Sequence, residues 1–220
     1  NIEVIDASSP AHIQLAMRPD TKSPHFQWFH FKVEGLHVGE PHHFSLNNAS
    51  QSSYNRAWTG YNAVASYDHQ DWFRVPSTFD GKALNFTLTP THSEVYFAYF
   101  EPYSRERHDW LVKHALENAG TELLATGKSV EGRDIPLLRR GNGAPGKRNI
   151  WIIAQQHPGE HMAEWFMEGL IERLVEQNDP QLAQLLDAAD LYLVPHMNPD
   201  GSFHGHLRTN ANGKDLNRCW

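Results

Sequence analysis

The apolar side chains change their type and spacing halfway along the chain, and this change limits the folds open to it. Of the 25 Phe, Trp and Tyr residues, 19 lie in residues 1–110. There they occupy short β-prone runs separated by turn formers such as Asn47-Asn48 and Asp80-Gly81. After residue 110, the apolar residues recur at helical spacing or in short runs typical of buried strands. The sequence therefore predicts two domains, 1–110 and 111–220.

The first domain is predicted to be an all-β sandwich, because several short strands follow one another at turn-separated spacing. We expect its core to contain Phe26, Trp28, Phe86 and Tyr96. No catalytic constellation is visible in it, so a structural or recognition module is the expected role. The predicted strands are 25–33, 63–67, 72–75, 83–88 and 94–100.

The second domain is predicted to be α/β. A helix is expected over 104–118 with a stop at Gly120, and a second one that buries Met162, Phe166, Leu170 and Leu174. Two helices between strands imply a crossover connection and a mixed sheet. The other expected elements are an antiparallel pair at 122–125 and 135–139, strands at 150–155 and 191–194, and a helix from 179 to 189.

Composition argues against several classes of partner. A net charge of −7 and a pI near 6.1 disfavour nucleic acids and anionic membranes, which attract clustered Lys and Arg. No run approaches the roughly 20 apolar residues of a membrane-spanning helix, and residues 1–6 lack the pattern of a signal peptide. The single cysteine, Cys219, cannot form an internal disulfide, which fits a reducing compartment.

A candidate metal pair follows the predicted strand 150–155. His157 and Glu160 are separated by Pro-Gly, a turn that lets both side chains point to one place. An imidazole and a carboxylate are suitable zinc ligands, and a catalytic zinc takes three protein ligands plus water. His-x-x-Glu also occurs in ordinary surface loops, but its place between a buried strand and a helix favours metal binding. We expect the adjacent His161 to start the helix.

A second polar cluster ends the chain. Asn-Pro-Asp-Gly at 198–201 is foremost a turn, and Arg208 and Arg218 lie in a polar segment where solvated arginines are common. Together with a zinc pair, they suggest a further interpretation. An enzyme that cleaves at chain ends needs a cation for the terminal carboxylate, which an Arg fork binds bidentately. It also needs a donor for the negative charge that develops on the scissile oxygen.

These motifs together resemble the zinc metallocarboxypeptidases. The resemblance rests on His-Pro-Gly-Glu at 157–160, Asn-Pro-Asp-Gly at 198–201, Arg208, and Asp-Leu-Asn-Arg at 215–218, in this order. Met-Ala-Glu-Trp after the zinc motif and the aromatic first domain are similar to the cytosolic carboxypeptidase branch. The segment 127–135 also resembles the family's sequence before its zinc strand.

The resemblance implies a role for each matching residue. His157 and Glu160 would bind one Zn²⁺, Arg208 would polarise the scissile carbonyl and stabilise the oxyanion, and Asn217 and Arg218 would hold the substrate's terminal carboxylate. The implied activity is removal of C-terminal residues, often glutamate, from peptide or protein tails. The resemblance and the low cysteine content imply a cytoplasmic protein.

Two parts of the family's machinery have no counterpart here. Its third zinc ligand is a His that follows Asn-Arg at a distance, and its general base is a later Glu, whereas this sequence stops at Trp220. His196, His204 and His206 precede the Asn-Arg pair. We therefore expect a catalytic domain truncated at its C-terminus, and a 220-residue piece that is inactive alone and binds zinc weakly.

Two other functions are also compatible with the sequence. A related zinc deacylase acting on N-acyl amino acids would use the same His-x-x-Glu and an Arg-rich pocket, although the aromatic first domain argues against it. A non-catalytic protein that recognises acidic C-termini would retain the Arg residues without stoichiometric zinc.

Overall fold

The computed structural model describes residues 1–176 and 178–220, and these form two compact units. The first, the β unit, comprises Asn1–Pro102 and His204–Thr209; the second, the α/β unit, comprises Tyr103–Phe203 and Asn210–Trp220. The sequence-based division at residue 110 falls inside helix α1 (Arg105–Asn118), which belongs to the α/β unit.

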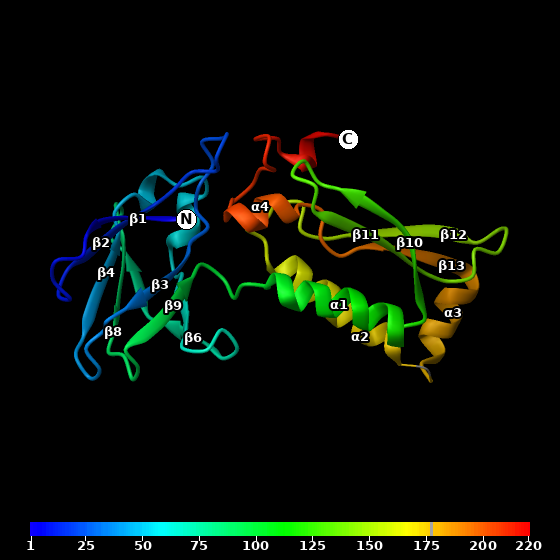
Figure 1. Ribbon diagram of the computed structural model, residues 1–220, viewed down its shortest axis with the longest axis horizontal. Helices are drawn as coiled ribbons and strands as arrows, with labels where there is room; N and C mark the ends of the chain where they lie inside the picture. Colours follow the sequence, from blue (N-terminus) through cyan, green and yellow to red (C-terminus); the bar gives the residue numbers. More distant parts are fainter. Residues whose placement is uncertain (177) are drawn as a thin grey trace. The chain divides into compact units, whose positions relative to one another are not determined.

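The β unit is a sandwich of a five-stranded and a four-stranded sheet (Figure 1), which confirms the predicted all-β class. Its core lies between the sheets and draws side chains from both. One sheet has the order β1 (Ile2–Asp6), β2 (Ile13–Met17), β4 (His42–Leu46), β8 (Leu84–Leu88), β7 (Ser77–Phe79). The other has the order β3 (His30–Glu34), β9 (Glu94–Ala98), β5 (Ala63–Ser66), β6 (Trp72–Val75), and the short helices η1 (Ala49–Gln51) and η2 (Asn55–Trp58) join β4 to β5.

Most of the predicted aromatic core is present. Trp28 and Phe86 are buried, and Phe26 packs against the core from a half-buried position. The prediction for Tyr96 is wrong, because its neighbours Val95 and Phe97 point inward and are fully buried. Alternation along the strand therefore places Tyr96 on the outer face.

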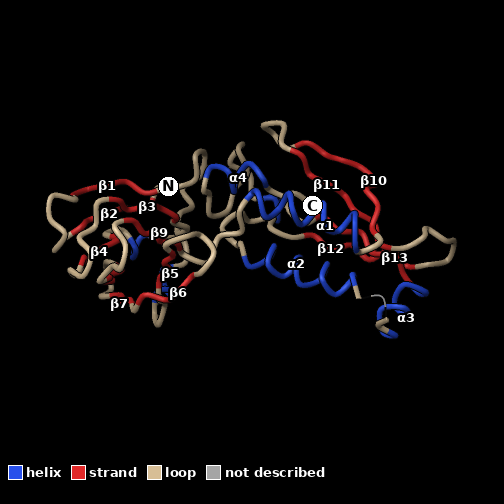
Figure 2. Tube along the Cα trace, turned by 60° about the horizontal axis from the view of Figure 1, so that its bottom comes forward, coloured by secondary structure: helices blue, strands red, loops and turns tan. Residues whose placement is uncertain are grey.

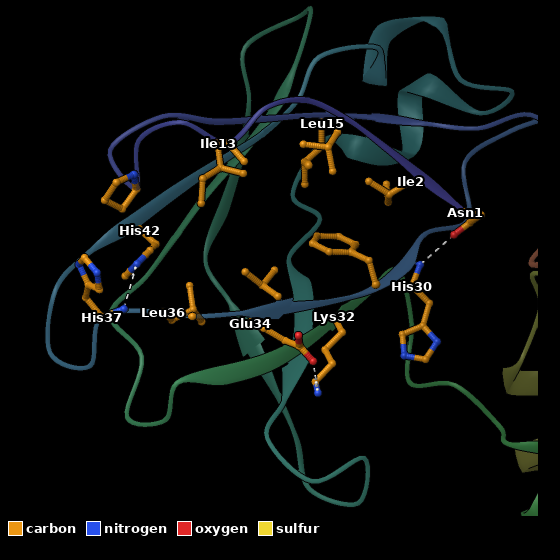
Figure 3. Close-up of a pocket in the computed structure, with 16 residues that line it drawn as sticks. Asn1, Ile2, Ile13, Leu15, His30, Lys32, Glu34, Leu36, His37 and His42 are labelled. Atoms are coloured by element: carbon orange, nitrogen blue, oxygen red, sulfur yellow. Dashed lines mark hydrogen bonds and ion pairs between the residues drawn. The ribbon is translucent and has the colours of Figure 1, made fainter.

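A cavity of about 600 Å³ opens between the two sheets, at the edge formed by β1 and β3 (Figure 3). Its lining combines apolar side chains such as Ile13 and Leu15 with three histidines. Among the described residues that line it, the one carboxylate is that of Glu34, which lies 2.6 Å from the Lys32 ammonium. His42 is engaged as well, since its Nε2 accepts the backbone N–H of His37. Glu34 and His42 are thus engaged with other groups of the protein.

The α/β unit contains a four-stranded mixed sheet, again as predicted. β12 pairs with β13 in parallel, while β10–β11 and β11–β13 are antiparallel. Helices α1 and α2 pack against each other and share one apolar core with the sheet (Figures 1 and 2). The elements are β10 (Thr121–Lys128), β11 (Asp134–Arg140), β12 (Arg148–Ile153), α2 (Met162–Val175), α3 (Pro180–Ala188) and β13 (Ala189–Val194).

Local signals set the helix ends. The Ser104 side chain accepts the N–H of Arg107 and caps α1, and Gly120, with φ of +60°, follows its end. Asp179 caps α3 through the N–H of Gln181. These are the boundaries that the sequence predicts for both helices.

The predicted buried face of α2 is wrong in the first half of the helix and correct in the second, where Leu174 is buried and Leu170 packs against the core. Met162 and Phe166 are 44% and 61% exposed, whereas Met167, Ile171 and Leu174 are buried. Apolar residues spaced by four at every step drift around a helix with 3.6 residues per turn. The buried stripe instead alternates steps of three and four, which keeps it on one face.

Asn198–Gly201 is more than a turn, because helix α4 (Pro199–His204) begins there. The Asn198 side chain accepts the N–H of Gly201 at 3.0 Å, and Pro199 occupies the first helical position. Asp200 is 1% exposed and lies in the first turn of the helix.

The Asp200 carboxylate links the β10–β11 connection to α4 through hydrogen bonds. It accepts the Ser129 hydroxyl at 2.6 Å, the Glu131 N–H at 3.0 Å and the Arg133 guanidinium at 2.7 Å. Burial disfavours its charge, but the bonds from Ser129 and Arg133 outweigh burial and leave its pKa below the usual 3.8.

We predict that Asp200→Asn lowers the free energy of unfolding of the α/β unit at pH 7 by about 2–3 kcal/mol. Because the folded-state pKa is lowered, the charged carboxylate stabilises the fold above its unfolded pKa, and this contribution disappears as the pH falls through the folded value. Urea unfolding of the intact protein at pH 7 and pH 3 should therefore show a large difference from wild type only at pH 7. The exposed Asp187→Asn is the control, and an equal difference at both pH values contradicts the account.

Candidate functional site

The parallel pairing of β12 with β13 brings two functional loops to the same edge of the sheet. Ile153 pairs with Val194, so both strands end together. The N–H of Ala154 then donates to the Val194 carbonyl, and the N–H of Met197 donates to the Ala154 carbonyl, each at 3.0 Å. The carboxyl ends of adjacent parallel strands are where α/β proteins place ligands.

The loop that contains His157 is held in an uncommon backbone conformation. Gln155 has a φ of +52°, a region that non-glycine residues rarely adopt. Its side-chain amide donates to the Pro158 carbonyl at 3.0 Å, and the amide of Asn198 donates to the Gln156 carbonyl at 3.0 Å. Asn198 therefore caps α4 and braces the His157 loop at the same time. Local strain of this kind is typical of functional sites.

His157 lies between two carboxylates. Its Nε2 is 3.0 Å from Oδ1 of Asp215, and its Nδ1 is 3.1 Å from Oε1 of Glu160. If Nε2–H donates to Asp215, Nδ1 presents a lone pair to the Glu160 carboxylate. Two acceptors that face each other this closely favour a cation between them, and a carboxylate behind a histidine is the usual support of a zinc ligand.

The spacing of these two atoms suits zinc. Ligands about 2.0–2.1 Å from a tetrahedral zinc are separated from each other by about 3.4 Å, close to the observed 3.1 Å. Within residues 1–176 and 178–220, no group of three His, Cys, Asp or Glu side chains is arranged to hold a metal. The described residues thus provide two donors with the right chemistry, and a closed site needs one more.

Asp215 has a role that the sequence motifs do not predict. Its Oδ1 also accepts the N–H of Asn217 at 3.0 Å and caps the short helix η3 (Leu216–Arg218). The same oxygen therefore ties the predicted carboxylate-binding residues to His157. A signal was present in the sequence, since Asp two positions before Asn217 is a typical helix cap.

Asn217 and Arg218 are exposed at the surface of the α/β unit. An Arg218 N–H donates to the Asn217 carbonyl at 3.0 Å. In the part of the chain that the structure describes, Arg218 forms no ion pair with a carboxylate. Its guanidinium is thus available to an anionic ligand.

Arg208 lies in the segment His204–Thr209, which belongs to the β unit. Its backbone is bound by Asp20 and its guanidinium donates to the hydroxyl of Tyr54. The structure therefore groups His157, Glu160, Asn217 and Arg218 in one unit, and Arg208 in the other.

The other histidines near the motifs have protein partners. His161 precedes α2, and its Nδ1 accepts the N–H of Tyr103 at 2.9 Å. His196 is buried, which lowers its pKa, and its ring is 5.6 Å from that of His108. His108 in turn bonds the buried carboxyl of Glu164, whose pKa burial raises. This buried network joins α1, α2 and the end of β13.

The chain combines an aromatic β-sandwich with an α/β unit that holds a histidine and a carboxylate side by side at one edge of its sheet. None of the helices in residues 1–176 and 178–220 has the length and apolar run needed to cross a bilayer. Residues 1–100 match the family model of the cytosolic carboxypeptidase N-terminal domain, and residues 108–220 match that of the zinc carboxypeptidases. The chain therefore belongs to the zinc carboxypeptidase family.

Individual relatives agree with this assignment. A metallo-carboxypeptidase from Pseudomonas aeruginosa, solved in complex with (2-guanidinoethylmercapto)succinic acid, is 64% identical over the whole chain with a TM-score of 0.97. An uncharacterized protein of Zymomonas mobilis is 43% identical over the whole chain, and human cytosolic carboxypeptidase 6 is 29% identical. The chain spans 59%, 57% and 48% of these proteins, respectively.

We predict that Asp215→Asn weakens zinc binding to the intact protein roughly 10–100-fold, because His157 loses its charged support. Asparagine still caps η3, so the fold should be unchanged. Chelator competition measures the zinc affinity. The exposed Glu117→Gln on α1 should bind zinc like the wild type, and an unchanged affinity in Asp215→Asn would show that Asp215 does not support a ligand.

Proposed function

We propose that the intact protein is a zinc-dependent carboxypeptidase that removes C-terminal residues from peptides or proteins. The observation that supports it most is His157 Nδ1 facing the Glu160 carboxylate at 3.1 Å while Asp215 holds Nε2. His157 and Glu160 would hold the zinc ion. When bound, zinc supplies Lewis-acid activation of water and of the scissile carbonyl.

The remaining residues act on the substrate. Arg218 binds the terminal carboxylate with its guanidinium fork, and Asn217 adds an amide donor. Arg208 places positive charge where the carbonyl oxygen becomes negative, which lowers the barrier most if the donor is already in position. Asp215 aligns the carboxylate-binding turn with the metal ligand through one shared oxygen.

Activity requires a third zinc ligand and a general base, and residues 1–176 and 178–220 hold no cluster of three metal-ligating side chains. We propose that both come from the part of the protein outside this sequence, since the relatives are longer. Loss of a general base costs roughly 10²–10⁴-fold in rate. The 220-residue piece alone should accordingly be inactive.

We further propose C-terminal glutamate as the preferred substrate residue and the cytoplasm as the site of action. Both rest on the match of residues 1–100 to the cytosolic carboxypeptidase N-terminal domain. The compound bound to the Pseudomonas relative carries two carboxylates and a guanidino group, so it supports a site for a terminal carboxylate and not a particular side chain. Comparing peptides that end in Glu, Lys and Phe tests the glutamate preference.

Metal content and hydrolysis of the intact protein test the main proposal. We expect one zinc per chain and release of C-terminal amino acids that stops on chelation and returns with zinc. Hydrolysis of N-acyl amino acids but not of peptides would favour a deacylase. Binding of acidic C-termini without zinc or cleavage would favour a non-catalytic receptor, and either result overturns the proposal.

We predict that Arg218→Ala raises KM roughly 100-fold for peptides with a free terminal carboxylate and changes kcat much less. Arg218→Lys should be intermediate, since Lys retains the charge but not the bidentate fork. Steady-state kinetics with free and C-terminally amidated peptides measures this. The exposed Arg148→Ala serves as the control, and an unchanged KM in Arg218→Ala would refute the assigned role.

A further inference from the structure

The segment that contains Arg208 is hydrogen-bonded to the buried carboxylate of Asp20 within the β unit. Asp20 is 4% exposed. Its Oδ1 accepts the N–H of Leu207 at 2.6 Å, and its Oδ2 accepts the N–H of Arg208 at 3.0 Å and that of Thr209 at 2.8 Å. The Thr209 hydroxyl adds a fourth bond at 2.9 Å. Charge-assisted bonds from three consecutive residues fix the backbone on both sides of Arg208.

Thr21, the residue after Asp20, forms further hydrogen bonds to the same segment. The N–H of Thr21 donates to Nε2 of His206 at 3.1 Å, and its hydroxyl lies 2.8 Å from the same nitrogen. Nδ1 of His206 is therefore the nitrogen that donates to the Thr209 carbonyl, at 2.9 Å. Asp20 and Thr21 thus hold residues 206–209 in one conformation.

The side chain of Arg208 is held at its far end by Tyr54. An Nη1–H donates to the Tyr54 hydroxyl, and the Tyr54 backbone is bonded on both sides by Gln27. Gln27 is fully buried, with its Oε1 2.8 Å from the Tyr54 nitrogen and its Nε2 2.9 Å from the Tyr99 hydroxyl. The backbone of Arg208 is therefore bonded to Asp20 and its guanidinium to Tyr54, and both partners belong to the β unit.

We infer that Asp20 and Tyr54 are positioning residues for Arg208, the arginine proposed to stabilise the oxyanion. This inference rests on the proposed function of Arg208. A preorganised donor stabilises developing charge without having to reorient during the reaction, and a displacement of about 1 Å costs roughly 10²-fold in rate. Asp20 sets the backbone of Arg208, and Tyr54 sets the direction of its guanidinium.

Tyr54→Phe tests the second contact, because it removes one hydroxyl from a side chain that is 48% exposed. We expect kcat of the intact enzyme to fall about 3–10-fold with KM and zinc content unchanged. In an Arg208→Lys background, the same change should have less than about a twofold effect, because the contact is already altered. Tyr67→Phe, which also removes a hydroxyl in the β unit, is the control. A kcat equal to that of Tyr67→Phe, or a loss of equal size in both backgrounds, overturns the inference for Tyr54.

Asp20→Asn tests the first contact. We expect kcat to fall about 10–100-fold with smaller changes in KM. Amide hydrogen exchange at residues 207–209 should be about tenfold faster than in wild type, and this readout does not depend on activity. If the wild-type enzyme cleaves no peptide, the proposed function fails, while the exchange rates still decide whether Asp20 holds the segment. Unchanged exchange, or a fall in kcat/KM due to KM alone, overturns the inference for Asp20.

Discussion

The parallel pairing of β12 with β13 is the constraint on which the candidate site depends. Because the two strands run in the same direction and end in register, the loop with His157 and the turn at Asn198 emerge side by side. Asn198 then braces the His157 loop from the start of α4. A change of register by one residue would separate these contacts and turn each side chain to the opposite face.

Polar groups in this protein often serve two elements at once. One oxygen of Asp215 supports His157 and caps η3, and the carboxylate of Asp200 joins α4 to the β10–β11 connection. Asp20 does the same for the segment 204–209 in the β unit. Shared acceptors of this kind couple the position of one functional residue to that of the next. A small displacement of one residue therefore moves its partner as well.

The sequence predicts most of this fold because local signals are strong. Caps at Ser104 and Asp179 and the glycine at 120 define helix ends, and the aromatic runs locate β3, β5, β6, β8 and β9. The other four strands of the five-stranded sheet, β1, β2, β4 and β7, are not predicted. The exposed face of α2 is misplaced because a uniform spacing of four resembles an amphipathic pattern but precesses around the helix.

The site is predictable in part. The motifs indicate His157, Glu160, Asn217, Arg218 and Arg208, because the chemistry of zinc and carboxylate binding requires those residue types. Asp215 receives a role only from the structure, since its partner His157 lies 58 positions away. The role of Asp20 cannot be predicted from the sequence for the same reason, because its partners Leu207 and Thr209 lie nearly the whole chain away. No local pattern encodes such distant pairs.

A crystal structure of the intact protein grown with zinc, with anomalous data at the zinc edge, would show whether His157 and Glu160 bind the metal. We expect a single strong peak within bonding distance, about 2.0–2.2 Å, of His157 Nδ1 and a Glu160 carboxylate oxygen, with Asp215 still bonded to Nε2. A peak elsewhere, coordination through Nε2, or no zinc at His157 and Glu160 would contradict this expectation.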